Sequence, residues 1–184
     1  MFDALKRWDK ELLVYLNNLG VEKFDIFWIF VTKIENWIPL FIFFAGLIFY
    51  FYKARKGFLV FVFTVLTFFV TLFFTDFVKD FVGRLRPNNV PSLAELIRVL
   101  QMPTSFSYFS GHASSSFAIT TFLVLSLRSF NKWVYFFYLW PVIFVASRIY
   151  LGVHYPSDVL TGAMVGVFFA FVGYSISMKI LEKL

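Results

Sequence analysis

The chain has 184 residues, of which 60% are hydrophobic, 23% aromatic and only 15% charged. A water-soluble globular protein of this length cannot hide so much apolar surface, so the composition favours a lipid environment and excludes an ordinary soluble protein. The chain has no cysteine, which excludes disulfides and thiolate metal sites. The net charge of +6 comes from short basic clusters between apolar runs, a pattern typical of membrane topology rather than of a nucleic-acid-binding face.

The first segment, residues 1–20, predicts an amphipathic helix that lies at a membrane interface. Apolar residues recur at helical spacing over residues 2–18, while Lys6, Arg7 and Lys10 point elsewhere. The segment does not resemble a signal peptide, because charged and apolar residues alternate in it and no small-residue cleavage site follows.

Apolar runs in the remainder, residues 21–184, predict an all-α fold, an integral-membrane bundle of six transmembrane helices. The first run, "FDIFWIFVT", is short and reaches across a bilayer only with its flanking residues and with tilt. The length of the other runs and their lack of period-2 alternation favour helices over strands. These are "NWIPLFIFFAGLIFYFY", "GFLVFVFTVLTFFVTLFFTDFV", "HASSSFAITTFLVLSL", "WVYFFYLWPVIFVAS" and "VLTGAMVGVFFAFVGYSISMKI". We expect residues 1–184 to form a single membrane-embedded domain.

The basic clusters predict the orientation of this bundle. With six crossings, the clusters at residues 6–10, 53–56, 128–132 and 179–183 all fall on one side, which the positive-inside rule makes cytoplasmic. Both termini are then cytoplasmic, and the polar segments between spans three and four and between spans five and six face the periplasm or the cell exterior. The first of these contains "PSLAELIRVLQ", which predicts a short outer-face helix with Ser92 and Glu95 at capping-box spacing.

Cationic residues from separate polar segments meet at the predicted outer face. A phosphate monoester carries nearly two negative charges at pH 7 and needs several cationic donors, which Lys79, Arg86 and Arg148 can supply. Any one of them alone is better explained as a residue that snorkels to the interface. Ser110 and Gly111 precede an apolar run, where helix-terminal amides can bind an anion or where Ser110 simply caps the helix.

The only two histidines, His112 and His154, lie in the same polar segments. A lone histidine at a membrane interface is more often a polar side chain that lies among the lipid head groups than a functional group. Two histidines among three cations, with Asp158 four residues after the second, suit a nucleophile and an acid. Asp158 can accept a hydrogen bond from one nitrogen of His154 and leave the other free to attack phosphorus. Its alternative role is to stabilise the first turn of the last helix.

These residues form a pattern that resembles the type 2 phosphatidic acid phosphatase (PAP2) family. The family signature K-x6-RP, PSGH and SR-x5-H-x3-D is matched in order by "KDFVGRLRP", "SGH" and "SRIYLGVHYPSD", with Phe109 where the family commonly has proline. The resemblance implies that His154 is the nucleophile and forms a phosphohistidine, and that Asp158 orients it. It also implies that His112 protonates the leaving alcohol and later activates water. By the same resemblance no metal or other cofactor is needed, and the phosphate is bound by Lys79, Arg86, Ser110, Gly111 and Arg148.

We therefore expect a metal-independent lipid phosphate phosphatase in the inner membrane of a bacterium. Its expected partners are the bilayer and a lipid phosphate substrate, and we expect no binding of nucleic acid. Phosphatidic acid, lipid A phosphate, undecaprenyl diphosphate and phosphatidylglycerol phosphate all present a similar anion, and the sequence does not choose among them. Resemblance to compact bacterial members favours an envelope glycolipid or a polyprenyl carrier. Arg84 and Arg98 are expected to contact head groups or to be solvated.

Other functions fit the sequence less well. The related vanadate haloperoxidases are soluble, unlike this chain. A transporter or binding protein for a phosphorylated lipid or solute would place charges near the middle of its spans, whereas residues 57–75 and 159–178 contain none. A scaffold protein would not need every catalytic position. Gly162 and Gly166 form a GxxxG pattern that we assign to packing within the chain, which is consistent with a monomer but leaves the oligomeric state open.

Overall fold

The computed structural model describes residues 2–183, and no strand occurs among them, so the all-α prediction is confirmed. The α-helices are α1 (Phe2–Asn18), α2 (Asp25–Val31), α3 (Ile38–Val82), α4 (Pro91–Ala94), α5 (Gly111–Leu127), α6 (Leu139–Tyr150) and α7 (Pro156–Leu181). Short 3-10 helices connect them: η1 (Glu22–Phe24), η2 (Ile34–Trp37), η3 (Pro87–Asn89) and η4 (Lys132–Tyr138).

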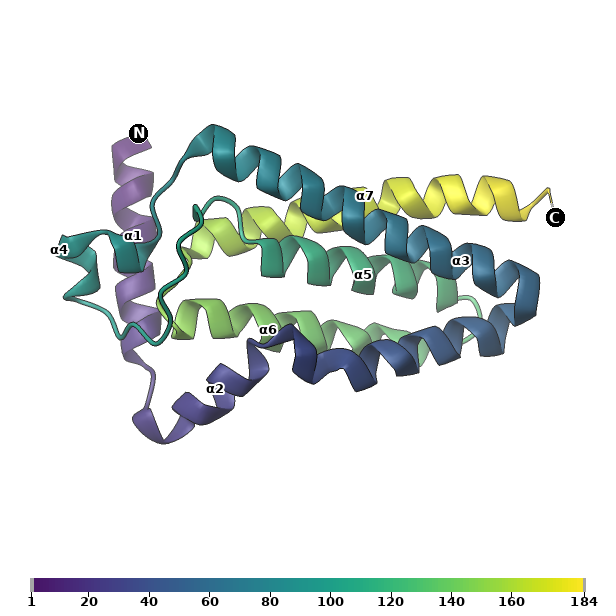
Figure 1. The fold of residues 1–184 in the computed structure, drawn as a ribbon, viewed down its shortest axis with the longest axis horizontal. Helices are drawn as coiled ribbons and strands as arrows, with labels where there is room; N and C mark the ends of the chain where they lie inside the picture. The colour runs from purple at the N-terminus through teal and green to yellow at the C-terminus, as the bar shows by residue number, and fades with distance from the viewer. Residues whose placement is uncertain (1, 184) are drawn as a thin grey trace.

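The helices α3, α5, α6 and α7 form an elongated bundle, and α1 stands across one end of it (Figure 1). The long helix α3 is interrupted at Lys53, where φ is 59° and ψ is −174°. The chain reverses there, so residues 38–52 and 54–82 form two antiparallel arms (Figure 1). Three helical segments are long and apolar enough to cross a membrane, Ile34–Asn89, Lys132–Tyr150 and Pro156–Leu181, and the apolar helix α5 is slightly shorter.

The second arm of α3 shows how the bundle distributes its side chains. Thr64, Thr67, Thr71 and Thr75 recur at helical spacing and are buried. The hydroxyl groups of Thr71 and Thr75 each donate to the carbonyl oxygen four residues earlier, at 2.7 Å, so they are buried without loss of hydrogen bonds. The outer face of the same arm exposes large aromatic side chains, among them Phe58, Phe69, Phe73, Phe77 and Phe81. An apolar exterior around a partly polar interior suits a lipid solvent.

The GxxxG pattern of α7 packs against α5 within the chain, as predicted. A Cβ atom on Gly162 would lie 2.6 Å from the backbone oxygen of Ser110 and 3.0 Å from the Cβ of Ala113. Glycine is therefore needed here so that the backbones of α5 and α7 can approach closely.

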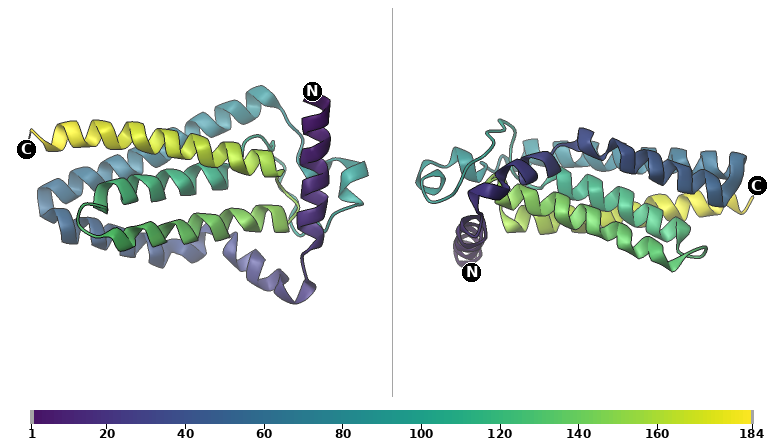
Figure 2. Two further views of the ribbon diagram at one scale, coloured as in Figure 1. Left: turned by 180° about the vertical axis from the view of Figure 1, so that it is seen from behind. Right: turned by 90° about the horizontal axis from the view of Figure 1, so that it is seen from below.

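The first predicted span does not cross the bundle, so the six crossings are not confirmed. α2 has only seven residues, a length of about 10 Å, whereas the hydrocarbon core is about 30 Å thick. Trp28 of α2 stacks on Tyr150 at the end of α6, with ring centroids 5.1 Å apart. Both α1 and α2 lie at the end of the bundle where α5 and α7 begin, whereas α7 ends at the opposite end (Figures 1 and 2). The beginning of α1 and the end of α7 therefore lie at opposite ends of the bundle, whereas the prediction placed both termini on one side of the membrane.

The predicted helix over "PSLAELIRVLQ" is also shorter than expected. It is α-helical only over Pro91–Ala94, and its N-cap is Val90, without a side-chain cap, rather than Ser92. Contacts with α1 and with the loop after α6 replace the helical hydrogen bonds of the following residues. The amide of Arg98 donates to Oδ1 of Asn17 at 2.6 Å, and the amide of Leu100 donates to the carbonyl of Leu151 at 3.2 Å.

Candidate active site

A cavity of about 500 Å³ opens where the C-terminal ends of α3 and α6 meet the N-terminal end of α5. Four of the eight predicted site residues line it: Lys79, Gly111, His112 and Arg148. The other four are buried, and their contacts are described below: Arg86, Ser110, His154 and Asp158. The fold thus gathers residues from three separate sequence segments at one end of the bundle.

His154 lies in the short loop between α6 and α7, and its hydrogen bonds define its tautomer. Its Nε2 is 2.9 Å from Nη1 of Arg86. Because a guanidinium can only donate, Nε2 must be the acceptor, and the proton of the neutral ring is on Nδ1. Nδ1 is 3.4 Å from Oδ2 of Asp158 and 3.4 Å from the hydroxyl oxygen of Ser107. The nitrogen that carries a free electron pair therefore faces the cationic side of the site.

The electrostatic environment keeps His154 neutral. Burial is the largest cause that holds the pKa of the His154 imidazole well below its usual range, and the charges of Arg86, Arg148 and Lys79 lower it further. A neutral imidazole surrounded by cations can act as a nucleophile toward an anion that those cations attract.

Asp158 is the third residue of α7, and its carboxylate is fully engaged. Oδ1 accepts from Nη1 of Arg84 at 2.7 Å. Oδ2 accepts from the hydroxyl of Ser107 at 2.5 Å and from the amide of Tyr155 at 3.1 Å. The sequence suggested two roles for Asp158, orienting His154 and stabilising the first turn of α7. The contacts for both are present, since Oδ2 faces Nδ1 of His154 and also accepts from the amide of Tyr155.

Two arginine side chains are held around the site by neutral groups. Arg86 donates to the backbone oxygen of Ser105 at 2.7 Å and to that of Val153 at 3.1 Å. Arg148 donates to Thr32 and, at 3.2 Å, to Oε1 of Gln101.

The cations around the cavity are only partly neutralised. Nε of Arg148 is buried without a hydrogen-bond partner in the described structure. The Lys79 ammonium is 3.7 Å from a carboxylate oxygen of the exposed Asp76. This arrangement suits an anionic ligand, because buried donors are normally paired.

The N-terminal end of α5 brings a histidine and a helix terminus to the cavity. The Ser110 hydroxyl oxygen accepts from the amide of Ala113 at 3.4 Å, so this side chain caps α5. A Cβ atom on Gly111 would lie 3.4 Å from the Lys79 ammonium, so glycine lets the helix end approach that cation. The His112 ring stacks on Phe144 with centroids 4.8 Å apart, which fixes its plane.

The structure corrects the expectation for Arg84 and Arg98, because both form internal ion pairs. Arg84 bridges Asp9 and Asp158, and Arg98 contacts Asp25 at 2.6 Å. Hydrogen bonds to Tyr150 and Asp25 raise the pKa of Arg98 above its usual value. Neither arginine is therefore a freely solvated side chain or a dedicated head-group contact.

Sequence reasoning missed several polar residues at the site. Ser107 contacts both His154 and Asp158, and Thr32 accepts from Arg148. Ser107 is one of several serines in "TSFSYFSG", and Thr32 follows an apolar run, so neither position carried a distinguishing signal. Phe109, which departs from the family motif, is buried beside Phe74.

Comparisons with known proteins give one family. The sequence profile of the PAP2 superfamily matches residues 58–182. A lipid A 4'-phosphatase of Bacteroides thetaiotaomicron is 30% identical over 190 residues, which cover all of this chain and 83% of that protein. An undecaprenyl-diphosphatase of Sulfolobus acidocaldarius is 28% identical over 170 residues, which cover 90% of this chain and 77% of that protein.

A solved structure shares the fold. The crystal structure of a transmembrane PAP2-type phosphatidylglycerolphosphate phosphatase from Bacillus subtilis aligns with a TM-score of 0.76 at 22% identity. The alignment covers 96% of this chain and 88% of that one, so the resemblance extends over almost the whole molecule.

Proposed function

The chain belongs to the PAP2 superfamily and is a membrane hydrolase of phosphoric esters, and from this premise we propose that it removes a phosphate group from the head group of a bacterial envelope lipid without a metal ion. The observation that carries the proposal is the arrangement around His154. Its Nε2 faces Arg86 at 2.9 Å, and its Nδ1 is backed by the buried carboxylate of Asp158. This arrangement supports a role of His154 as a nucleophile toward an anion that the neighbouring cations bind.

The proposed reaction has two displacements at phosphorus. The bound phosphate takes the place of Nε2 as the partner of Arg86, and Nε2 then attacks phosphorus while the bond to the lipid oxygen breaks. His112 takes up a proton as the phosphate anion enters the site and gives that proton to the lipid oxygen. In the second step His112 removes a proton from water, the water oxygen attacks the phosphohistidine, and inorganic phosphate leaves.

The binding residues have distinct tasks in this scheme. Lys79, Arg86 and Arg148 stabilise the charge that develops on the phosphoryl oxygens, and the capped end of α5 at Ser110 and Gly111 adds the positive end of its dipole. Asp158 accepts from Nδ1 of His154 and stabilises the ring as it gains positive charge.

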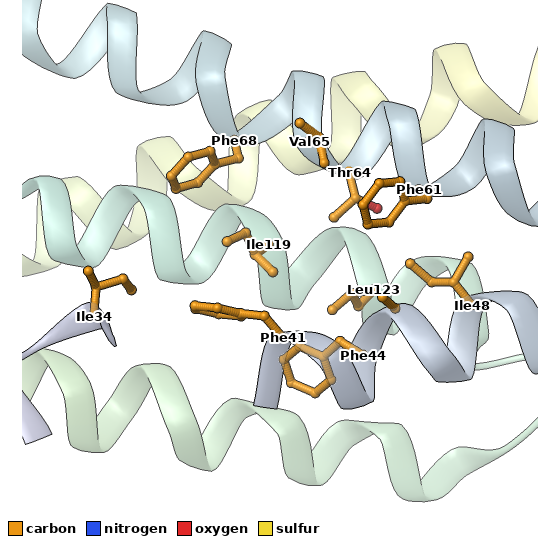
Figure 3. Close-up of a pocket in the computed structure, with 11 residues that line it drawn as sticks. Ile34, Phe41, Phe44, Ile48, Phe61, Thr64, Val65, Phe68, Ile119 and Leu123 are labelled. Carbon is orange, nitrogen blue, oxygen red and sulfur yellow. The ribbon is translucent and has the colours of Figure 1, made fainter. Parts of the chain in front are cut away.

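An apolar cavity beside the site suits the hydrocarbon part of the substrate. The cavity has a volume of about 290 Å³ and lies between the two arms of α3 and α5. Its wall includes Phe41 and Phe44 from one arm, Phe68 from the other, and Ile119 from α5 (Figure 3). Ile34 and Phe68 line both this cavity and the active-site cavity. A lipid chain held here would stay in the apolar layer while its phosphate reaches the cations.

We place the active site on the outer face of the bacterial inner membrane. The basic clusters at residues 53–56, 128–132 and 179–183 lie at the end of the bundle opposite the site (Figure 1). The positive-inside rule makes that end, with the C-terminus, cytoplasmic. The amphipathic helix α1 then lies along the outer interface as part of the same domain, residues 1–184. Because the small-residue face of α7 is used against α5, we propose a monomer.

The test is phosphate release by the purified protein in detergent with EDTA present. The panel comprises lipid A, undecaprenyl diphosphate, phosphatidylglycerol phosphate and phosphatidic acid, and His154→Ala is the control. We expect release from one or two of these lipids, absent in the variant, and an acid-labile phosphoryl group on the wild-type protein after rapid quenching. Binding of a lipid phosphate without release by the folded wild-type protein would instead favour a transport or binding role.

A further inference from the structure

A guanidinium group links helix α1 to the carboxylate behind His154. Nη1 of Arg84 donates to Oδ1 of Asp158 at 2.7 Å, and Nη2 of Arg84 donates to Oδ2 of Asp9 at 2.7 Å. Asp9 belongs to α1, yet only 5% of its surface is exposed. An acidic residue in the middle of an amphipathic helix is thus buried against the active-site end of the bundle.

Asp9 also holds the first turn of α7, from which Asp158 projects. Oδ1 of Asp9 accepts from the amide of Ser157 at 2.9 Å, and Oδ2 accepts from the Ser157 hydroxyl at 2.5 Å. Nη1 of Arg84 donates to the same hydroxyl oxygen at 2.9 Å. The Arg84 guanidinium lies over the ring of Tyr155, 3.7 Å from its centroid. The position and orientation of Arg84 are therefore fixed from several sides.

The contact has a direct electrostatic meaning for Asp158. A fully buried carboxylate needs a paired charge to remain ionised. Within residues 2–183, Arg84 is the one lysine or arginine that forms an ion pair with Asp158. Arg84 in turn reaches the carboxylate with a single nitrogen and uses the other for Asp9. Removing Asp9 would leave Nη2 of the Arg84 guanidinium without its carboxylate partner.

We propose that Asp9 and Arg84 are positioning residues for the proposed nucleophile: Asp9 holds Arg84, Arg84 holds Asp158 ionised, and Asp158, together with Arg86 at Nε2, keeps the proton of His154 on Nδ1. Helix α1 is then part of the active site as well as a contact with the membrane. The inference rests on the proposed role of His154.

A purely structural role of Asp9 can be separated from this one, because α1 has a second, independent anchor. The side-chain amide of Asn17 donates to the carbonyl oxygens of Ile149 at 3.0 Å and Tyr150 at 2.8 Å. Its Oδ1 accepts from the amide of Arg98 at 2.6 Å. Asp9→Asn can keep one acceptor oxygen toward the amide of Ser157 and replaces the oxygen that faces Arg84 by an NH₂ donor, while the Asn17 anchor keeps α1 docked.

The first test is a double-mutant cycle in kcat. We expect Asp9→Asn to lower kcat roughly tenfold and Arg84→Gln roughly a hundredfold, with KM changed less than about twofold in each. The double variant should match Arg84→Gln alone, because Asp9 acts through Arg84. Arg84→Lys, which keeps the charge but not the fork, should fall between wild type and Arg84→Gln.

The matched control is Glu11→Gln, which removes one carboxylate from the same helix, where it pairs with Arg7 at 3.9 Å on an exposed face. It should leave kcat unchanged. If the effects of Asp9→Asn and Arg84→Gln simply multiply in the double variant, or if Glu11→Gln lowers kcat as much as Asp9→Asn, the inference is wrong.

The second test needs no turnover. The chain has two histidines, so ¹⁵N-histidine labelling gives two imidazole spin systems, which His112→Asn assigns. In wild type we expect Nδ1 of His154 to be protonated and Nε2 unprotonated. In Asp9→Asn and Arg84→Gln the Nδ1 proton should exchange faster and the two nitrogen shifts should move toward each other, as a tautomer mixture requires. Unchanged His154 signals in both variants would overturn the inference. If wild type releases phosphate from no lipid, the proposed function fails, whereas these spectra still decide the positioning role.

Discussion

Two regions of the molecule are stabilised in different ways. The site end comprises α1 with residues 83–110 and 151–157, and there individual hydrogen bonds and ion pairs fix the chain, as at Asn17 and Arg84. The bundle body comprises α3, α5, α6 and α7 apart from the site residues at their ends, which belong to the site end, and in this body aromatic and aliphatic contacts dominate, as around Phe44, Phe122 and Trp140. A polar contact depends on one partner, whereas packing is shared among many. We therefore expect substitutions at the site end to affect catalysis and those in the bundle body to affect stability.

The largest expected effect is that of Asp158→Asn. The neutral amide accepts more weakly from Nδ1 of His154 than a carboxylate does and cannot stabilise a positive charge on the ring, so kcat should fall about 10³- to 10⁴-fold. The amide oxygen can still accept from the amide of Tyr155 at the start of α7, so the protein should remain folded. Phosphate release and the thermal midpoint are measured together. A variant that unfolds but retains kcat in its folded fraction would show that Asp158 serves only the start of α7.

Phe122→Ala tests the bundle body. Phe122 is fully buried on α5, and its removal should lower the free energy of unfolding by about 3 kcal/mol. The folded fraction should keep kcat within about threefold of wild type, because Phe122 does not line the active-site cavity. Unfolding is followed by SDS titration in mixed micelles, with Phe122→Leu as the milder control. A large loss of kcat at full stability would contradict the division between the two regions.

The low pKa of His154 predicts a pH dependence of stability that originates at the site end. The folded state resists protonation of this ring, whereas an unfolded histidine titrates near pH 6.5. The unfolded state therefore binds the extra proton below about pH 6.5, and the free energy of unfolding should fall there by up to about 1.4 kcal/mol per pH unit. Above that pH the contribution is complete.

To isolate this contribution, the free energy of unfolding of wild type is compared with that of His154→Asn. Both are measured by SDS titration at several pH values between about 5 and 8. The variant should lose stability less steeply than wild type as the pH falls. Equal slopes would show that the imidazole of His154 is not held neutral.

The smallest expected effect is a gain in stability from Gly46→Ala in the first arm of α3. A Cβ atom there would have no neighbour within 4 Å, so the substitution adds helix propensity without a clash. We expect the free energy of unfolding to rise by about 0.5–1 kcal/mol and kcat to stay the same. Gly162→Ala, at the close contact of α7 with α5, should be destabilising instead, and equal behaviour of the two glycines would contradict the packing described above.

The residues that meet at the candidate site could be singled out from the sequence because the family motifs are short and ordered. Lys79, Arg86, His112, Arg148 and His154 meet at one end of the bundle, as the motif order implied. The main helices were also predictable, since long apolar runs without period-2 alternation admit few alternatives.

The placement of the N-terminal segment could not be predicted. Counting "FDIFWIFVT" as a span brought α1 to the wrong end of the bundle, because the parity of crossings decides the side of everything before it. Asp9 lies between Lys6 and Lys10 on a helix with a polar face, so it reads as a surface residue. Its partner Arg84 is 75 positions away, and only the tertiary fold brings the two together. The reversal of the chain at Lys53 could not be predicted either, because no glycine or proline stands at that position.

That reversal also bears on how the cell can remove this protein. At the end of the bundle opposite the site, the arms of α3 are joined at Lys53, and residues 128–131 separate α5 from η4. A protease needs an exposed, extended stretch of chain, and these connections offer almost none. The long connection of residues 83–110, by contrast, contains only one turn of α-helix. We therefore expect a protease to cut first within this connection, where the contacts of Leu13 and Asn17 of α1 with Ile97 and Arg98 protect the chain.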